Sequence, residues 1–186
     1  MTAIDAGPGA TDRASYYYED YTLVDYNNAA NASGYINYAE LWFITGVMTY
    51  TLYIATLYWN SATSKYGTRD YFNIGTVLPG SKQTFTGFLL DVTIGDYAGV
   101  YYPVGYTIEF STSGYAGGVS YKYGQWLGTG EQTYTNAATR ACSIYYTGYS
   151  FWANILKINA MLCTNILKIN DIPMVTITKV NGVATT

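Results

Sequence analysis

Histidine is absent from this chain, and cysteine and charged residues are scarce. The 186 residues include two Cys and only 11% Asp, Glu, Lys and Arg, against about a quarter in ordinary soluble domains. Without His, the chain cannot hold a Ser-His-Asp or Cys-His catalytic site or a His-ligated metal. Cys142 and Cys163 lie in separate segments and form no C-x-x-C pattern. We expect both to be small core residues in a reducing compartment, and the spacing leaves a disulfide between them open.

Runs of positive charge are also missing. The net charge is −3, and no segment gathers Lys or Arg. Because nucleic-acid binding needs a basic patch, we expect none here. Residues Met1–Asp5 contain an acidic residue and no apolar stretch, so we expect no signal peptide. The uncharged stretch Leu41–Trp59 has the length of a membrane helix, but its Thr content and period of two predict a strand, so we expect no membrane association.

Tyrosine is the most abundant aromatic residue, with 23 copies against 6 Phe and 4 Trp. Tyr favours pleated, half-buried surfaces, and apolar residues alternate with polar ones in short segments separated by turn signals. The expected strands lie at 15–25, 35–44, 47–59, 71–77, 88–94, 100–104, 106–111, 119–127 and 142–146. This pattern predicts an all-β fold, an antiparallel β-sandwich of the jelly-roll type over residues 16–150. Residues 1–15, rich in Gly, Pro, Asp and Ala, are expected to form an extended N-terminal arm.

Residues 151–186 contain an internal repeat. The segment Asn154–Asn159 (NILKIN) recurs at Asn165–Asn170 and, more loosely, at Thr176–Asn181, so the copies begin 11 residues apart. The last copy continues into Asn181-Gly182, a strong hairpin signal. Short units of this kind cannot bury a core alone. We expect a C-terminal β-ribbon that caps the sandwich edge or anchors the subunit to a neighbour, and the candidate anchoring residues are Ile155, Ile158, Ile166, Ile169, Ile177 and Val180.

Carboxylates that could form a catalytic pair are few. Glu19 and Asp20 are adjacent in an expected strand and therefore point to opposite faces. Asp91 lies opposite the apolar face of its segment, and Asp96 follows Gly95 in an expected turn. A calcium site at Asp91 or Asp96 is an alternative, although no calcium-loop, P-loop or dinucleotide motif is present. We expect no catalytic residues, no metal and no cofactor.

Aromatic side chains are the best candidates for contacts with a partner. Exposed Trp and Tyr can stack on sugar rings, whereas the competing interpretation places them in the core and in a subunit interface. Tyr121 and Tyr123 share one face of their expected strand. The candidate carbohydrate or partner contacts are Trp59, Tyr101, Tyr102, Tyr121, Tyr123 and Trp126.

Turn motifs lie at Ala3–Asp5, Ala10–Arg13, Asn28–Gly34, Gly80–Gly87, Thr93–Gly99, Ser113–Gly117 and Tyr146–Gly148. Together these segments resemble a β-sandwich module of phage and prophage proteins. In such proteins the module is often joined to repeats of the type Ile-x-Lys-Val-Asn-Gly-Val, which Ile177–Val183 resembles, although the first two repeats have Ala160 and Asp171 in place of Gly.

The resemblance implies a component of the virion. We expect a non-enzymatic structural protein at the virion surface, assembled in the host cytoplasm. It would be a capsid decoration or cement protein or a head-fibre subunit that binds and stabilises the major capsid protein or other virion proteins. A homo-oligomer, a trimer by analogy with virion symmetry, is expected. The alternative is a tail-fibre or receptor-binding subunit that recognises host surface carbohydrate, and a cellular carbohydrate-binding module is a third possibility.

Overall fold

The computed structural model describes residues 2–16, 20–44, 51–78, 80–103 and 108–150, together with the backbone of four two-residue strands between 168 and 184. The chain divides into two compact units, Met1–Phe151 and Trp152–Thr186. All regular elements of the described residues are β-strands, and none of these residues belongs to a helix able to cross a membrane.

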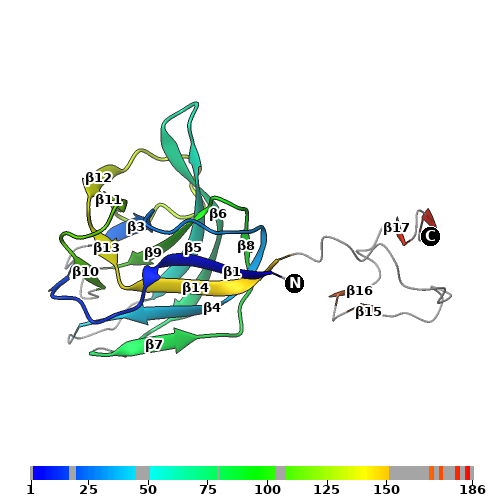
Figure 1. Ribbon diagram of the computed structural model, residues 1–186, viewed down its shortest axis with the longest axis horizontal. Coiled ribbons are helices and arrows are strands. Elements are labelled where there is room, and N and C mark those ends of the chain that lie inside the picture. The colour runs from blue at the N-terminus through cyan, green and yellow to red at the C-terminus, as the bar shows by residue number, and fades with distance from the viewer. Residues whose placement is uncertain are drawn as a thin grey trace. The chain divides into compact units, whose positions relative to one another are not determined.

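The first unit is built from antiparallel sheets (Figure 1). The β4 sheet has the order β1 (Ala3–Gly9), β14 (Ile144–Ser150), β4 (Gly34–Trp42) and β7 (Lys82–Phe85), with β8 (Leu90–Val92) also paired to β4. The β9 sheet has the order β12 (Thr135–Ala138), β11 (Gly118–Tyr123), β3 (Tyr21–Asp25), β9 (Tyr97–Tyr102), β5 (Leu52–Asn60) and β6 (Lys65–Gly75). A small third sheet joins β13 (Ala141–Cys142), β10 (Glu109–Ser111) and β2 (Ser15–Tyr16).

One hydrophobic core lies between the two large sheets. Ile36 and Leu41 of β4 are buried in the same cluster as Leu23 of β3 and Val100 of β9. Full burial of each such side chain contributes about 1.5–3 kcal/mol. A hydroxyl of the β4 sheet, that of Tyr146, donates a hydrogen bond across the core to the Gly99 carbonyl of β9 at 2.5 Å. The predicted antiparallel β-sandwich is therefore confirmed, and the jelly-roll topology stays a prediction.

The expected N-terminal arm is in large part a strand of the sandwich. β1 pairs with β14 along its length, and Ile4 and Ala6 are buried in the core. The small residues that suggested an arm permit close packing, because a Cβ at Gly7 would collide with the Ile144 carbonyl oxygen. Gly7 also has a φ of +89° where the register of β1 shifts. This Gly-rich segment forms a bulged edge strand.

The uncharged stretch that resembled a membrane span ends in a strand that is covered on both faces. Leu52 and Ile54 of β5 lie in the core between the sheets. Ala55 and Leu57 lie in a second buried cluster, on the other side of the β9 sheet. Burial on both faces explains why this strand carries no charge. Residues 45–50 lie outside the described residues.

The C-terminal unit contains two hairpins with the same register. β15 (Lys168–Ile169) pairs with β16 (Ile172–Pro173), and β17 (Lys179–Val180) pairs with β18 (Val183–Ala184). The two pairs are 11 residues apart, so the sequence repeat is a repeat of hairpins, and the second pair flanks the predicted Asn181-Gly182 turn. Of the candidate anchoring residues, Ile169 and Val180 belong to these strands. Ile155, Ile158, Ile166 and Ile177 lie outside the described residues.

Candidate binding surfaces

An aromatic cluster covers the face of the β9 sheet that points away from the core. At its centre, the ring of Tyr66 lies 4.8 Å from Trp59, 5.5 Å from Tyr134 and 6.1 Å from Tyr97, measured between ring centroids. The segment after β11 packs on this face through Leu127 and Tyr134. It also pairs with β6, because Gln132 exchanges backbone hydrogen bonds with Tyr66 at 3.0 and 2.7 Å. We call Trp59, Tyr66, Tyr97 and Tyr134 the outer aromatic cluster.

Trp59 is the exposed member of this cluster, at 45% exposure, and it lies beside the tip of the β5–β6 hairpin. Figure 1 shows this hairpin projecting beyond the sheet. The tip is held by Glu131, whose carboxylate accepts hydrogen bonds from the Asn60 amide and the Thr63 hydroxyl, both at 2.7 Å. These hydrogen bonds hold the pKa of Glu131 below its ordinary value. Trp59 is thus presented on a braced hairpin, which suits contact with a partner.

Tyr101 and Tyr102 do not form a common site. Successive residues of a strand point to opposite faces, and Tyr102 is fully buried in the core between the sheets. Tyr101 lies on the outer face, half-buried, with its ring 6.0 Å from that of Tyr53. The prediction that Tyr102 contacts a sugar or partner is therefore wrong, because the β4 sheet covers the face on which it lies.

Tyr121 and Tyr123 do share one face of β11, as their spacing predicts. Both rings contact Tyr21 edge-on, with centroids at 5.3 and 6.2 Å. Tyr121 packs against the core, whereas Tyr123 is 63% exposed. Trp126 is half-buried, with its indole N–H donating to the Tyr123 carbonyl at 2.5 Å and the Lys122 ammonium 4.0 Å above its ring. Tyr123 therefore offers far more free surface than Tyr121 or Trp126.

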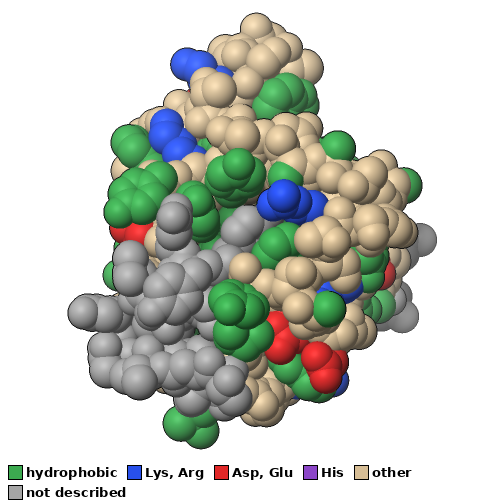
Figure 2. All heavy atoms as spheres, turned by 90° about the vertical axis from the view of Figure 1, so that its left-hand side faces the viewer, with side chains coloured by type: hydrophobic (Ala, Val, Ile, Leu, Met, Phe, Trp, Pro, Cys, Tyr) green, Lys and Arg blue, Asp and Glu red, His purple; other side chains and the backbone are tan. Residues whose placement is uncertain are grey.

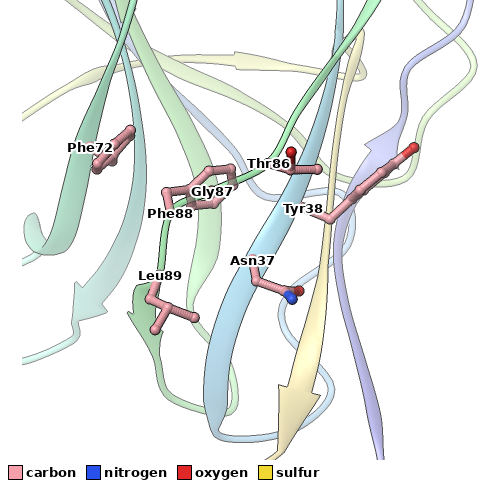
Figure 3. Close-up of a pocket in the computed structure, with 7 residues that line it drawn as sticks. All are labelled: Asn37, Tyr38, Phe72, Thr86, Gly87, Phe88 and Leu89. Atoms are coloured by element: carbon pink, nitrogen blue, oxygen red, sulfur yellow. The ribbon is translucent and has the colours of Figure 1, made fainter. Parts of the chain in front are cut away.

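A groove lined in part by aromatic residues was missed by sequence reasoning. It has a volume of about 650 Å³ and is lined by Asn37 and Tyr38 of β4, Phe72 of β6, and residues 86–89 between β7 and β8. Figure 3 shows Phe72, Phe88 and Leu89 on one side of it and Asn37 and Tyr38 on the other. The rings of Phe72 and Phe88 are stacked, with centroids 5.7 Å apart and planes inclined by 28°.

The groove exists because strand pairing is interrupted there. β4 pairs with β8 through 34–36 and with β7 through 39–42, so Asn37 and Tyr38 fall between the two partners. On the opposite edge of β4, the pairing with β14 shifts register at Asn37, because Thr147 pairs with Tyr38 and Gly148 pairs with Ile36. The 86–89 segment therefore loops away from the sheet between β7 and β8. The adjacent apolar residues Phe88 and Leu89, which break the strand alternation, are the one sequence signal for this loop.

The carboxylates considered for chemistry have structural partners or are simply solvated. Asp96 is buried and forms an ion pair with Arg69, and it also accepts a hydrogen bond from the Thr93 N–H at 2.7 Å. Because Arg69 neutralises it, Asp96 is a poor calcium ligand, and Asp91 is exposed. Glu19 lies outside the described residues. Among the residues that the structure describes, no three acidic, Cys or His residues group as a metal site.

Cys142 is a free, fully buried thiol. Burial raises its pKa well above the ordinary value, so the reactive thiolate is disfavoured. The expectation that this cysteine is a core residue is confirmed. Cys163 lies outside the described residues.

Basic side chains are dispersed over the surface. Figure 2 shows the side of β10 and β12, where the Lys and Arg side chains lie apart among hydrophobic and neutral polar groups. Most of the cations of the sandwich have local partners: Arg69 pairs with Asp96, Lys82 with Glu40, and Lys122 with the Trp126 ring.

Comparison of the chain with protein-family models, curated proteins and solved structures found no match.

Proposed function

We propose that this chain is a non-enzymatic structural subunit of a phage particle, a capsid decoration or cement protein or a head-fibre subunit, that binds neighbouring virion proteins through its C-terminal unit. The observation that carries the proposal is the division of the chain into a sandwich and a separate C-terminal unit with hairpins repeated every 11 residues. The sequence resemblance to a phage sandwich module with C-terminal repeats supports the same role.

The hairpins are suited to pairing with another protein. Each has only two residues per strand, and isolated hairpins are marginally stable at best in water. The cross-strand pairs Ile169↔Ile172 and Val180↔Val183 occupy equivalent positions. The backbone register therefore repeats a pairing of two apolar residues every 11 residues, and strands added by a partner would lengthen these short hairpins.

Charge also favours association of the C-terminal unit with an acidic surface. Residues 152–186 contain Lys157, Lys168, Lys179 and Asp171, which gives +2, so residues 1–151 carry −5 of the total of −3. Opposite charges on two surfaces increase the rate of association and favour one orientation. The sandwich of a second copy has the required sign, which supports a homo-oligomer.

The proposal is tested with purified particles and the chain lacking residues 152–186. The full-length chain is expected to sediment with particles, and the truncated chain is expected to remain in the supernatant while keeping its β-sheet circular dichroism. Quantitative mass spectrometry of the particles gives the copy number. A number comparable to that of the major capsid protein supports decoration of the shell, whereas absence of the protein from particles would contradict the virion role.

A receptor-binding subunit that recognises host carbohydrate is the second candidate function. The groove beside Phe72 and the exposed Trp59 favour it, because sugar-binding proteins use aromatic rings as contact surfaces. A copy number far below that of the major capsid protein would favour this candidate over the shell role.

A further inference from the structure

We propose that the groove between β4, β6 and the 86–89 segment binds an uncharged saccharide, with Phe72 as the ring platform and Asn37 and Thr86 as hydrogen-bonding groups. This site goes beyond attachment through the C-terminal unit and deepens the second candidate function. All of its residues belong to the sandwich, so it can be tested without a virion.

The platform is supported by a second aromatic ring. Phe88 is buried in the core, and Phe72 stacks on it at a centroid distance of 5.7 Å while remaining 40% exposed. The orientation of the Phe72 ring is therefore set before any ligand arrives, which lowers the entropy cost of binding. The C–H-rich face of a pyranose ring is flat and apolar and can pack against such a ring, as aromatic side chains do with one another.

Two neutral polar side chains lie on the same groove. The Asn37 amide has two N–H donors and a carbonyl acceptor, and the Thr86 hydroxyl can donate and accept. None of the hydrogen bonds of the described residues uses either group, and both residues are exposed. Both are therefore available to the hydroxyl groups of a sugar bound in the groove, across from Phe72 and Phe88 (Figure 3).

The charge of the lining selects an uncharged ligand. None of the described residues that line the groove is Asp, Glu, Lys or Arg, and the Tyr38 hydroxyl already donates a hydrogen bond to the Glu40 carboxylate at 2.9 Å. A volume of about 650 Å³ lies within the usual range for small-molecule sites. A neutral groove with an aromatic platform and polar groups at its rim is complementary to a neutral oligosaccharide, whereas a purely aliphatic ligand would leave Asn37 and Thr86 unpaired.

The test is ligand-observed NMR with the full-length chain and neutral oligosaccharides of glucose, galactose, mannose, rhamnose and N-acetylglucosamine. At least one is expected to receive saturation from aromatic protons and to bind saturably. Phe72→Ala is expected to weaken binding by about tenfold, the size of one good aromatic contact, and Phe72→Tyr to retain it. Asn37→Ala, an exposed change that leaves the core intact, is expected to weaken binding by about threefold to tenfold.

Tyr71→Ala is the matched control, because it removes a similarly exposed ring (43% against 40% for Phe72) from the opposite face of β6. It is expected to leave saccharide affinity unchanged. The proposal is overturned if no oligosaccharide of the panel binds, if binding survives both Phe72→Ala and Asn37→Ala, or if Tyr71→Ala abolishes it instead. Circular dichroism shows whether each variant is folded. Because the readout is solution binding, its failure says nothing about particle attachment, which the sedimentation assay measures separately.

Discussion

At the scale of single residues, Asp25 is the most consequential buried charge. It lies at the end of β3 and accepts hydrogen bonds from the Asn27 N–H at 3.0 Å, the Asn27 amide at 2.8 Å and the Cys142 N–H at 2.6 Å. Asn27 in turn donates to the carbonyls of Gly118 and Arg140. These hydrogen bonds link the end of β3 to β11 and β13. Desolvation by burial raises the pKa of Asp25 to about 6 from its ordinary value of 3.8.

We therefore expect the sandwich to gain stability from Asp25 as the solution becomes mildly acidic. The folded state binds the Asp25 proton more tightly than the unfolded state, so this contribution is full below about pH 4 and is lost as the pH rises through about 6. Between pH 7 and pH 5 it adds about 1 kcal/mol to the free energy of unfolding.

Urea denaturation at pH 5 and pH 7 measures the free energy of unfolding of the wild type and of Asp25→Asn, whose side chain cannot titrate. The advantage of the wild type over the variant should be larger at pH 5 than at pH 7. An equal difference at both pH values would show that Asp25 does not titrate in this window.

At the scale of elements, the junction of β4 and β14 organises one side of the sandwich. These strands pair from Gly34↔Ser150 to Leu41↔Ile144 and shift register between Thr147 and Gly148. A Cβ at Gly148 would collide with the backbone carbonyl of Tyr35. The shift falls at Asn37, which on the other side of β4 lies between the partners β7 and β8, so the close approach at Gly148 adjoins the groove.

Gly148→Ala is expected to lower the free energy of unfolding by about 2–3 kcal/mol, because the strands must separate to admit the methyl group. Thr147→Ala, at the neighbouring half-buried position, introduces no such collision and should cost less than about 1 kcal/mol. Urea denaturation compares the two variants. Similar losses in both would show that general damage to β14, rather than the collision, sets the cost.

At the scale of the whole molecule, the sandwich has a core of its own. The core residues that the structure describes lie between Ile4 and Tyr146, within the first compact unit. The C-terminal unit has a net charge of opposite sign and repeats a small hairpin. A sandwich with its own core, followed by a unit of repeated hairpins, suits a protein that attaches through the C-terminal unit and exposes the sandwich.

The chain truncated after residue 151 is accordingly expected to unfold in a single cooperative transition, with a Tm within about 3 °C of that of the full-length chain. Differential scanning calorimetry measures both values at the same protein concentration. A much lower Tm for the truncated chain would mean that the C-terminal unit contributes to the stability of the sandwich, which contradicts a role in attachment alone.

The amino-acid sequence by itself determined the class of the fold and the repeat. Alternation of apolar residues is a local property, so it predicted the strands that became β4, β5 and β8 and the shared face of Tyr121 and Tyr123. The sequence repeat has a spacing of 11 residues, and the two hairpins have the same spacing in their backbone pairing. Because the sequence contains no His, it offers no His for a Ser-His-Asp or Cys-His catalytic site or for a metal site.

Only the tertiary structure decided which face of each strand is covered. A period of two shows that Tyr101 and Tyr102 point apart, but the position of the β4 sheet is what buries Tyr102. β1 belongs to the sheet because it pairs with β14, which is distant from it in the sequence. The Gly-rich composition of β1 did not indicate a strand. The groove arises where β4 lacks a partner between β7 and β8, and such an interruption depends on three strands at once, so no local pattern could predict it.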